Sequence, residues 1–410
     1  MAGTNLLPVA DALAQILEGA GIASAPESVP LSQAHNRRLA ADLAARRTQP
    51  PAALSAMDGY AVRRADIETV PAVLTMIGTS AAGHGFHGAV KAGETVRIFT
   101  GAPLPEGTDT IVIQEDTDAS GNSITMKESE PLGRHVRAAG LDFKSGDVLL
   151  EKGRRLGPVE LALAAAMNHS HVEVARRPLV AILATGDELV APGTEPGPDQ
   201  IVASNNFAVA AYVERAGGQV LDLGIAPDNF PDIEAAIRRA REANADVLVT
   251  LGGASVGDHD LVQDALKNEG MDLGFWRIAM RPGKPLMHGS IGDMRVLGLP
   301  GNPVSAIVCA ILFLVPLVRA LTGDPGAGED ISIPALLGED MRENDTRQDY
   351  VRSRVSGLHD GAPVATPFSR QDSSMLGTLA QSQGLIIRPP FAPPAKKGDA
   401  CRVILLDTPA

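Results

Sequence analysis

Four apolar segments between residues 178 and 322 dominate the pattern of the chain, because each one runs into a Gly- or Asp-rich turn. They read PLVAILATG, QVLDLGIAPD, ADVLVTLGG and MRVLGLPGN, and they have the length of buried strands. Helical spacing predicts helices over residues 204–215, 230–242, 261–268 and 303–321. Strands that alternate with helices are typical of a parallel, doubly wound sheet. We therefore predict an α/β domain over residues 178–323.

The remainder of the chain has shorter and more varied patterns. Helical spacing over residues 6–17 predicts a packing helix, and short β-type runs between Gly and Pro predict an inserted β domain over residues 51–137. A strand near 146–153 and a helix near 158–167 follow, so residues 1–50 and 138–177 are expected to form one discontinuous α+β domain. Short strands with one helix near 375–381 predict a C-terminal β-barrel-like domain over residues 324–410. The fold class predicted for the whole chain is multidomain α/β.

Composition and charge restrict the classes of partner. The 410 residues contain 36 Lys and Arg against 49 Asp and Glu, a net charge of −13, which argues against nucleic acid or an anionic membrane surface as a partner. The apolar run from Val304 to Val318 is shorter than a bilayer span, so no membrane insertion is expected. Two cysteines make no disulfide framework, and no Lys or Arg precedes Arg37, as a secretory signal would require. We therefore expect a cytoplasmic protein.

Acidic residues occupy the turns that follow the predicted strands, namely Glu188, Asp228, Asp258 and Asp260. The carboxyl ends of parallel strands meet at one edge of the sheet, where helix N-termini offer N–H groups to anionic ligands. Acids at this edge would repel an anion bound at Gly252 and Gly253 unless a cation lay between them, and carboxylate oxygens suit Mg²⁺. The alternative is that each acid only caps a helix and complements its dipole.

Cationic residues cluster in the segment FWRIAMRPGKP, which holds Arg277, Arg281 and Lys284. A Pro-Gly turn between Arg281 and Lys284 brings them close together, so a phosphate or another tetrahedral oxyanion would fit, whereas the alternative is a solvated surface turn. The chain has no GxxxxGK[ST] loop, no GxGxxG at the start of the α/β domain, and no metal-binding spacing of Cys and His. These absences argue against a P-loop enzyme and a dinucleotide cofactor.

Six motifs in series extend over most of the chain: SAMDGYAV, FTGAPLPEGTDTIV, ATGDEL, GGASVGDHD, RPGKP and GLPGNPVS. In this order they resemble the molybdopterin molybdenumtransferase family, to which the E domain of gephyrin also belongs. The resemblance implies a four-domain homodimer whose active cleft is completed by the neighbouring subunit. It also implies an enzyme of molybdenum cofactor biosynthesis that inserts molybdate into adenylylated molybdopterin with Mg²⁺-dependent release of AMP.

The resemblance implies roles for particular residues. The catalytic acids are expected to be Asp58, Glu188, Asp228 and Asp260, and the last three are also the expected Mg²⁺ ligands. Molybdate is expected to be held by Arg281, Lys284, Ser305, Arg347 and Ser373. The remaining substrate contacts are expected from Thr100, Thr185, Gly252, Gly253, Ser255, Gly257, Asp258, Arg277, Pro300, Gly301, Asn302 and Pro303.

Two other functions compete with this interpretation. A molybdopterin adenylyltransferase shares the α/β domain and its GGxSxG loop, but such an enzyme resembles that domain alone, so adenylylation is expected from a separate partner. A non-catalytic scaffold is the second alternative, because gephyrin binds receptor tails through its E domain. The acids and cations kept at the predicted site favour an enzyme.

Overall fold

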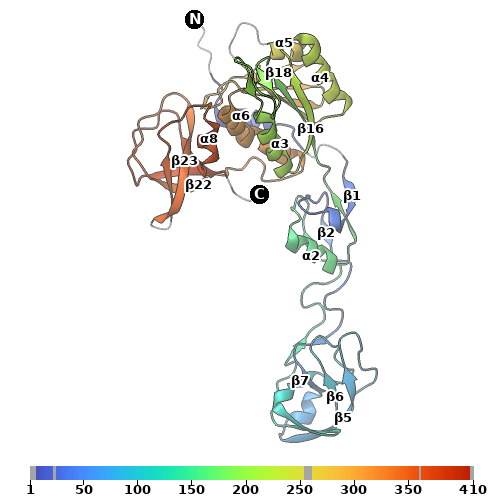
Figure 1. The fold of residues 1–410 in the computed structure, drawn as a ribbon. Coiled ribbons are helices and arrows are strands. Elements are labelled where there is room, and N and C mark those ends of the chain that lie inside the picture. The colour runs from blue at the N-terminus through green and yellow to red at the C-terminus, as the bar shows by residue number, and fades with distance from the viewer. Residues whose placement is uncertain (1–5, 22–24, 254–260, 360–361, 407–410) are drawn as a thin grey trace. The chain divides into compact units, whose positions relative to one another are not determined.

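The computed structural model describes residues 6–21, 25–253, 261–359 and 362–406. By their internal contacts, these residues form two compact units (Figure 1). The first unit comprises Met1–Glu27, Asn36–Ala40 and Val174–Ala410, and the second comprises Ser28–His35 and Ala41–Glu173. The chain therefore passes from the first unit into the second and back twice.

A six-stranded sheet forms the centre of the first unit. Its order is β16 (Gln219–Ala226), β13 (Leu179–Thr185), β17 (Val247–Leu251), β21 (Met294–Leu299), β20 (Met287–Ile291) and β18 (Asp272–Trp276). The first four strands are parallel, as predicted, and the last two are antiparallel, which differs from the prediction of a wholly parallel sheet. Only Gly292 and Asp293 separate β20 from β21, and a two-residue turn can join antiparallel strands but not parallel ones.

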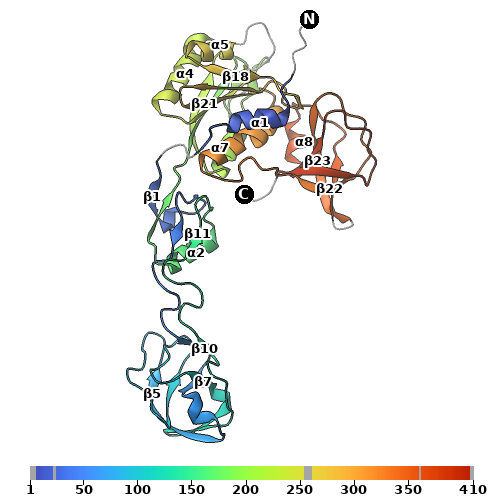
Figure 2. The same cartoon turned by 180° about the vertical axis from the view of Figure 1, so that it is seen from behind.

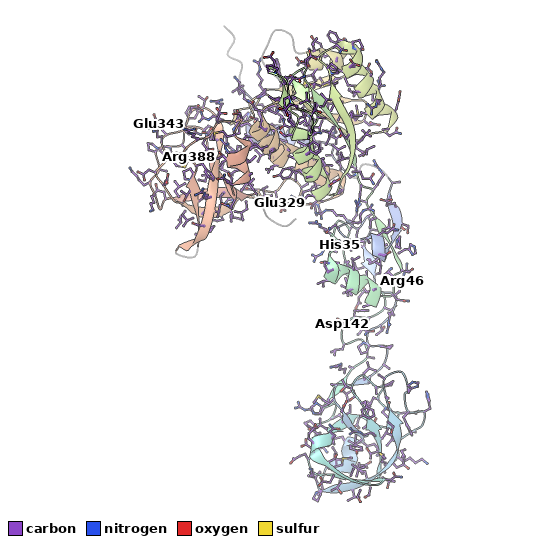
Figure 3. All side chains as sticks on the ribbon, in the orientation of Figure 1. His35, Arg46, Asp142, Glu329, Glu343 and Arg388 are labelled. Carbon is purple, nitrogen blue, oxygen red and sulfur yellow. The ribbon has the colours of Figure 1, made fainter. Side chains whose placement is uncertain are left out.

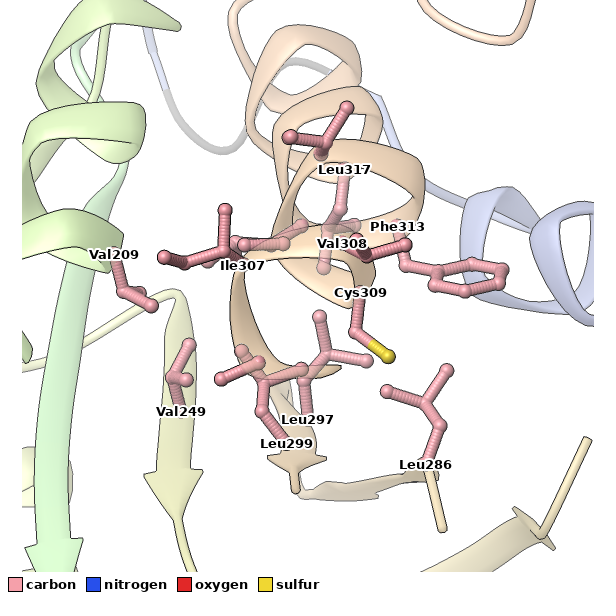
Figure 4. Packing of buried hydrophobic residues seen from close by; sticks show 14 of the residues in the cluster. Val209, Val249, Leu286, Leu297, Leu299, Ile307, Val308, Cys309, Phe313 and Leu317 are labelled. Atoms are coloured by element: carbon pink, nitrogen blue, oxygen red, sulfur yellow. The ribbon is translucent and has the colours of Figure 1, made fainter. Parts of the chain in front are cut away.

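Helices cover both faces of this sheet. In β13 the side chains of Val180 and Ile182 pack in one core cluster and those of Ala181 and Leu183 pack in another, as the two-residue period of a strand requires. The first cluster contains residues from α3 (Asn205–Arg215), α6 (Pro303–Cys309) and α7 (Val315–Leu321), and the second contains residues from α4 (Phe230–Glu242) and α5 (Leu261–Asn268). Figure 4 shows the first cluster, where Ile307 and Val308 lie above Leu297 and Leu299 of β21. The predicted doubly wound architecture is confirmed.

One continuous helical segment runs over Pro303–Leu321, with a π-helical stretch at Ala310–Leu314 between α6 and α7. It has 19 residues and is apolar enough to cross a bilayer, so the expectation that this run is too short was wrong. In the fold, 83% of the most apolar 18-residue stretch of this helix is buried. Burial inside the protein, rather than a short length, therefore distinguishes it as a core helix.

The N-terminal helix α1 (Val9–Leu17) packs in the first core cluster through Ala12 and Ile16, which are both fully buried. This packing differs from the expected grouping of residues 1–50 with residues 138–177. The amphipathic spacing of α1 showed which face is buried, but it did not show which other element covers that face.

A closed barrel follows the α/β sheet in the first unit. Five strands pair in the cycle β23, β24, β22, β26, β25 and back to β23, and they cover Gln348–His359, Ala362–Pro367, Ile333–Leu337, Ala400–Leu405 and Gly384–Arg388. Figure 3 labels Arg388 in this barrel. The short strand β19 (Met280–Arg281) adds in parallel to β23, and α8 (Leu376–Ala380) lies between β24 and β25 in the sequence. The predicted β-barrel-like region is confirmed.

The second unit is built mainly from a six-stranded sheet (Figure 2). Its order is β7 (Thr110–Ile113), β4 (Gly59–Val62), β6 (Glu94–Ile98), β5 (Ala72–Ser80), β9 (Ser123–Met126) and β8 (Thr117–Ser120). Short pairs flank it, namely β2 (Leu43–Ala44) with β11 (Val148–Leu150), β3 (Leu54–Ser55) with β10 (Val136–Arg137), and β1 (Glu27–Pro30) with β12 (His171–Val174). Helix α2 (Pro158–Ala166) and the single turns Leu31–Gln33, Arg64–Ile67 and Gln114–Asp116 complete the described elements.

Candidate functional site

A pocket of about 810 Å³ lies at the carboxyl ends of the parallel strands in the first unit. Its lining includes Thr185 at the end of β13, Leu251 at the end of β17, and Pro300 after β21. The chain leaves β13 toward α3 on one face of the sheet and leaves β17 toward α5 on the other face. Ligands of open α/β sheets bind at such a switch point. The pocket is therefore the candidate site.

Many of the residues predicted from sequence line this pocket: Thr185, Glu188, Asp228, Gly252, Gly253, Pro300, Gly301, Asn302 and Pro303. They come from four separate turns, and the tertiary fold brings them to one concave surface. Ser255, Gly257, Asp258 and Asp260 lie outside the described residues. Their predicted roles stay predictions.

The turn after β17 depends on two glycines. Gly252 and Gly253 have φ angles of +103° and +63°, which residues with a side chain rarely adopt. A Cβ on Gly252 would lie 2.7 Å from the carbonyl oxygen of Thr185, and one on Gly253 would lie 2.1 Å from Cγ2 of Val262. The missing side chains thus leave room for the close packing of the turn and for a ligand above it.

Replacing Gly253 by alanine is expected to lower the free energy of unfolding by roughly 2–4 kcal/mol, because backbone strain adds to overpacking against Val262. Gly270 is a matched control, since its φ is +88° but a Cβ at this position would have no atom within 4 Å. Gly270→Ala should therefore show the strain alone. Urea unfolding of both variants would measure the difference, and equal losses would contradict the packing role of Gly253.

Two polar atoms in the pocket have no hydrogen-bond partner among the described residues. They are Oγ1 of Thr185, a residue that is 3% exposed, and Oδ1 of Asn206 in the first turn of α3. The side chain of Ser204, the residue that precedes α3, makes no capping hydrogen bond. Unpaired buried polar groups cost free energy, and both residues belong to the lining of the pocket.

The acidic side of the pocket brings carboxylates close together. Burial raises the pKa of Asp228, and the charges of Asp187 and Glu188 raise it further, while a backbone hydrogen bond from Asp187 opposes the shift. The N–H of Asp228 in turn donates to Oδ1 of Asp187 (3.0 Å). Within the described ranges, no cluster of three or more His, Cys, Asp or Glu residues is suited to hold a metal ion. Mg²⁺ commonly takes only one or two protein carboxylates together with substrate phosphates, and Glu188 and Asp228 can supply these.

Two predicted oxyanion ligands are already paired with carboxylates. The Arg281 guanidinium donates to Asp345 (3.1 Å) and to Asp349, and these contacts raise its pKa. Arg347 donates to the same Asp345 carboxylate (3.3 Å). Both arginines were expected to hold molybdate, and the structure places them in one carboxylate network at the junction of β19 and β23.

The other predicted cations differ in their surroundings. The Arg277 guanidinium lies 4.0 Å above the centre of the Trp276 ring, and neither residue lines the pocket. No described residue forms an ion pair or hydrogen bond with the Lys284 ammonium, and Lys284 immediately precedes Pro285, which does line the pocket. Lys284 is therefore the predicted cation best placed to meet an anion.

Arg352 on β23 is a cation that sequence reasoning missed. It is 1% exposed, it donates to Oε1 of Gln371 (3.3 Å) and to the carbonyl of Met375 (3.1 Å), and no described carboxylate forms an ion pair with it. Its two contacts flank Ser374, which lines the pocket. The sequence contained one indication that Arg352 is buried. The two-residue period of a strand puts Arg352 on the same face as Tyr350, which is buried.

The segment around Ser373 joins the barrel to the loop after β21. Oγ of Ser373 accepts a hydrogen bond from Nδ2 of Asn302 (3.0 Å), and its carbonyl accepts one from the N–H of Val304 (3.1 Å). Ser305 lies buried in the first turn of α6. Ser373 and Ser305 do not line the pocket themselves, but they are close in the sequence to the lining residues Ser374 and Pro303.

Asp58 and Thr100 form a pair in the second unit. Oδ1 of Asp58 accepts hydrogen bonds from the N–H of Thr100 (2.7 Å) and from its hydroxyl (2.8 Å). These bonds lower the pKa of Asp58, and the positive charge of Arg97 lowers it further. Sequence reasoning did not predict this contact, which keeps the Asp58 carboxylate ionised.

Comparisons with known proteins agree with this geometry. Family models match the MoeA N-terminal region (domain I and II) over residues 7–168, a probable molybdopterin binding domain over 181–320, and the MoeA C-terminal region (domain IV) over 334–406. The molybdopterin molybdenumtransferase of Haemophilus influenzae is 36% identical over 383 residues, which is 93% of this chain and 94% of that protein. The one from Bacillus subtilis is 33% identical over 393 residues, which is 93% of this chain and 90% of that protein.

A solved structure extends the similarity to the fold. The crystal structure of a molybdopterin biosynthesis MoeA protein from Pyrococcus horikoshii superposes with a TM-score of 0.85 at 29% identity, and the alignment covers 98% of this chain and 100% of that chain. Together these matches define a MoeA-type multidomain protein. The chain belongs to the molybdopterin molybdenumtransferase family, a family of transferases in molybdenum cofactor biosynthesis. The family and the enzyme class expected from the sequence motifs are confirmed.

Proposed function

We propose that the chain inserts molybdate into adenylylated molybdopterin, with Mg²⁺-dependent release of AMP. The observation that supports this most directly is the pocket at the switch point of the sheet, because it combines an anion-binding edge with an acidic edge. A phosphoanhydride substrate would use the anion-binding edge for its phosphates, and its cation would use the acidic edge. The relatives' name, molybdopterin molybdenumtransferase, agrees with this choice of substrate.

The phosphate groups are best accommodated at the glycine turn and the helix starts. Gly252 and Gly253 let a ligand approach the backbone, and α3 and the helical segment that begins at Pro303 both start at the pocket. Free N–H groups and the positive ends of the helix dipoles favour anions there. This edge would hold the pyrophosphate of the substrate.

The acidic edge fits Mg²⁺. Glu188 and Asp228 would hold the ion, and the raised pKa of Asp228 means that its ionised form is disfavoured while no cation is present. When bound, Mg²⁺ would screen these carboxylates from the substrate phosphates and polarise the phosphoanhydride. Asp228 and Glu188 would hold that charge beside the phosphates of the substrate.

Molybdate would be held by cations and hydroxyls at the barrel side. Lys284 and the buried Arg352 form no ion pair with a described carboxylate. Ser373 bonds to Asn302 in the loop that leads into α6, and Ser305 lies in the first turn of that helix. A tetrahedral dianion needs charge-assisted donors around it. Arg347 would join them only if the Asp345 carboxylate moved away, and Arg281 only if it were also released from Asp349.

Further parts of the proposal concern assembly and setting. We propose a homodimer in which Asp58 and Thr100 of a neighbouring subunit complete the cleft, and a separate adenylyltransferase that supplies the substrate. The divisions 1–50 with 138–177, 51–137, 178–323 and 324–410 remain our proposed domain boundaries, with helix α1 of the first division packed on the α/β core. Both described cysteines are free thiols, which agrees with a cytoplasmic setting.

The test is AMP release from adenylylated molybdopterin, with Mg²⁺ and molybdate each present or omitted. We expect release to require both. Release without molybdate would instead indicate a hydrolase, and no release from folded protein would favour a scaffold. Consumption of ATP in the presence of molybdopterin would favour the adenylyltransferase alternative.

A further inference from the structure

We infer that Arg97 is a positioning residue, which fastens the strand end that carries Asp58 to the strand end that carries Thr100 and so fixes the orientation of the Asp58 carboxylate. The role of Asp58 in the reaction rests on the proposed function. The positioning by Arg97 rests on contacts within the second unit alone.

The strand register brings the two chain segments together. Strand β4 begins at Gly59, directly after Asp58, and β6 ends two residues before Thr100. Gly59 and Ile98, the last residue of β6, are register partners in this antiparallel pair. On its other side, Gly59 pairs with the last residue of β7, a strand that Figure 1 labels beside β6. Three strand ends therefore meet at Asp58.

The Arg97 guanidinium bonds across these strand ends. Arg97 lies on β6, its Nη1 donates to the carbonyl of Gly59 on β4 (3.2 Å), and its Nη2 donates to Oε1 of Gln114 in the turn after β7. The N–H of Gln114 donates in turn to the carbonyl of Asp58 (3.1 Å). One side chain thus connects all three segments, and the backbone of Asp58 is held from both sides.

Two aromatic rings hold the guanidinium in place. It lies 5.0 Å from the centre of the Tyr60 ring and 5.1 Å from the centre of the Phe99 ring. Tyr60 is the register partner of Arg97, and Phe99 follows two residues later, so all three share one face. A planar guanidinium can stack on rings and still donate hydrogen bonds in its own plane. Its contacts to Gly59 and Gln114 therefore have a fixed geometry.

The Asp58 carboxylate depends on such support. Thr100 is exposed, and both hydrogen bonds that it donates to Asp58 go to the same oxygen, Oδ1, so this pair has little packing of its own. These hydrogen bonds lower the pKa of Asp58 more than the charge of Arg97 does. Arg97 therefore acts on Asp58 mainly by holding it against Thr100, and only secondarily by its charge.

The first test is amide hydrogen exchange at Thr100, measured by NMR on the full chain without substrate. Exchange in Arg97→Met should become at least about fivefold faster and approach that in Asp58→Ala, which lacks the acceptor. Lys127→Met is the matched control, because Lys127 is a cation of the same sheet that pairs with Asp118 (3.3 Å) at the far edge. It should exchange as wild type does. Exchange at the wild-type rate in Arg97→Met would overturn the inference.

The second test is a double-mutant cycle on AMP release. With active wild-type protein, Arg97→Met should lower kcat roughly 10- to 100-fold, because a misplaced group loses its productive geometry. The same substitution in the Asp58→Asn background should cost less than about twofold, since the group through which Arg97 acts is already lost. Losses that multiply in the double variant would show that Arg97 acts independently of Asp58 and would contradict the positioning role.

Arg97→Lys separates geometry from charge and serves as the second variant if Arg97→Met does not fold. A lysine ammonium keeps the charge, but it cannot stack between two rings and bond to both Gly59 and Gln114. We expect its kcat and its exchange rate at Thr100 to be close to those of Arg97→Met, and wild-type values would overturn the inference. An inactive wild type would contradict the proposed function, whereas the exchange rates decide the positioning role separately.

Discussion

Asp228→Asn is expected to reduce Mg²⁺-dependent AMP release by roughly 10²- to 10³-fold and, at neutral pH, to raise the melting temperature of the metal-free protein. Activity should fall because the variant loses one of the two carboxylates in the pocket that suit Mg²⁺. Stability should rise because the neutral amide removes the repulsion from Asp187 and Glu188. Opposite effects on stability and function are expected when a site keeps an unfavourable charge for its ligand.

The stability difference should depend on pH in a defined direction. The folded-state pKa of Asp228 is raised above its ordinary value of 3.8, mainly by burial and then by the neighbouring carboxylates. Its contribution to stability is therefore fully present below that ordinary value, and it is lost as the pH rises through the raised folded-state pKa. Wild type and Asp228→Asn should melt at similar temperatures in acid, and wild type should melt earlier at neutral pH.

Thermal melting with and without Mg²⁺ would test both parts of this prediction. Added Mg²⁺ should stabilise wild type and have less effect on Asp228→Asn. Asp232→Asn is a matched control, because Asp232 is an exposed carboxylate one turn further along and does not line the pocket. An Mg²⁺ response that survives in Asp228→Asn would show that this carboxylate is not a ligand.

Arg352→Met is expected to raise the KM for molybdate roughly 10- to 100-fold, because it removes a buried cation and its charge-assisted hydrogen bonds. Methionine has a similar length and no charge, so it can occupy the same space in the barrel. The lost contacts to Gln371 and to the Met375 carbonyl should change the free energy of unfolding by only about 1–2 kcal/mol. The dependence of AMP release on molybdate concentration would measure the effect.

Arg388→Met is the control for Arg352→Met. Arg388 is a second buried arginine of the same barrel, and its Nη2 donates to the carbonyls of Arg342 (3.0 Å) and Pro393 (2.5 Å). Its loss should lower stability and leave the molybdate dependence unchanged. If both variants changed stability alone, Arg352 would have only a structural role.

Part of the site followed from the sequence because strand ends are local features. The runs that became β13, β16, β17 and β21 are apolar over the right length, and the turns after them carry Gly252, Gly253, Glu188 and Asp228. Parallel strands place all such turns at one edge, so residues far apart in the chain were correctly expected together. The antiparallel strands β18 and β20 were not predicted, since their sequences DLGFW and MHGSI interrupt the apolar pattern with Asp, His, Ser and Gly.

The charged residues were harder to interpret than the turns. Arg281 and Arg347 were expected to hold molybdate, but Asp345, which is distant from Arg281 in the sequence, pairs with both. Arg352 was not considered, because a strand arginine is usually solvated and only the closed barrel buries it. The state of a charged group depends on neighbours from other elements, and the local pattern carries no information about those neighbours.

The sequence by itself determined the family, the α/β and barrel architecture, and the turns that build the pocket, because periodicity and turn chemistry act over a few residues. Only the tertiary structure decided that α1 packs on the α/β core, that Arg352 is buried and unpaired among the described carboxylates, and that Asp345 pairs with both Arg281 and Arg347. Burial and pairing arise from contacts between elements that are far apart in the chain. They therefore appear only when the chain is folded.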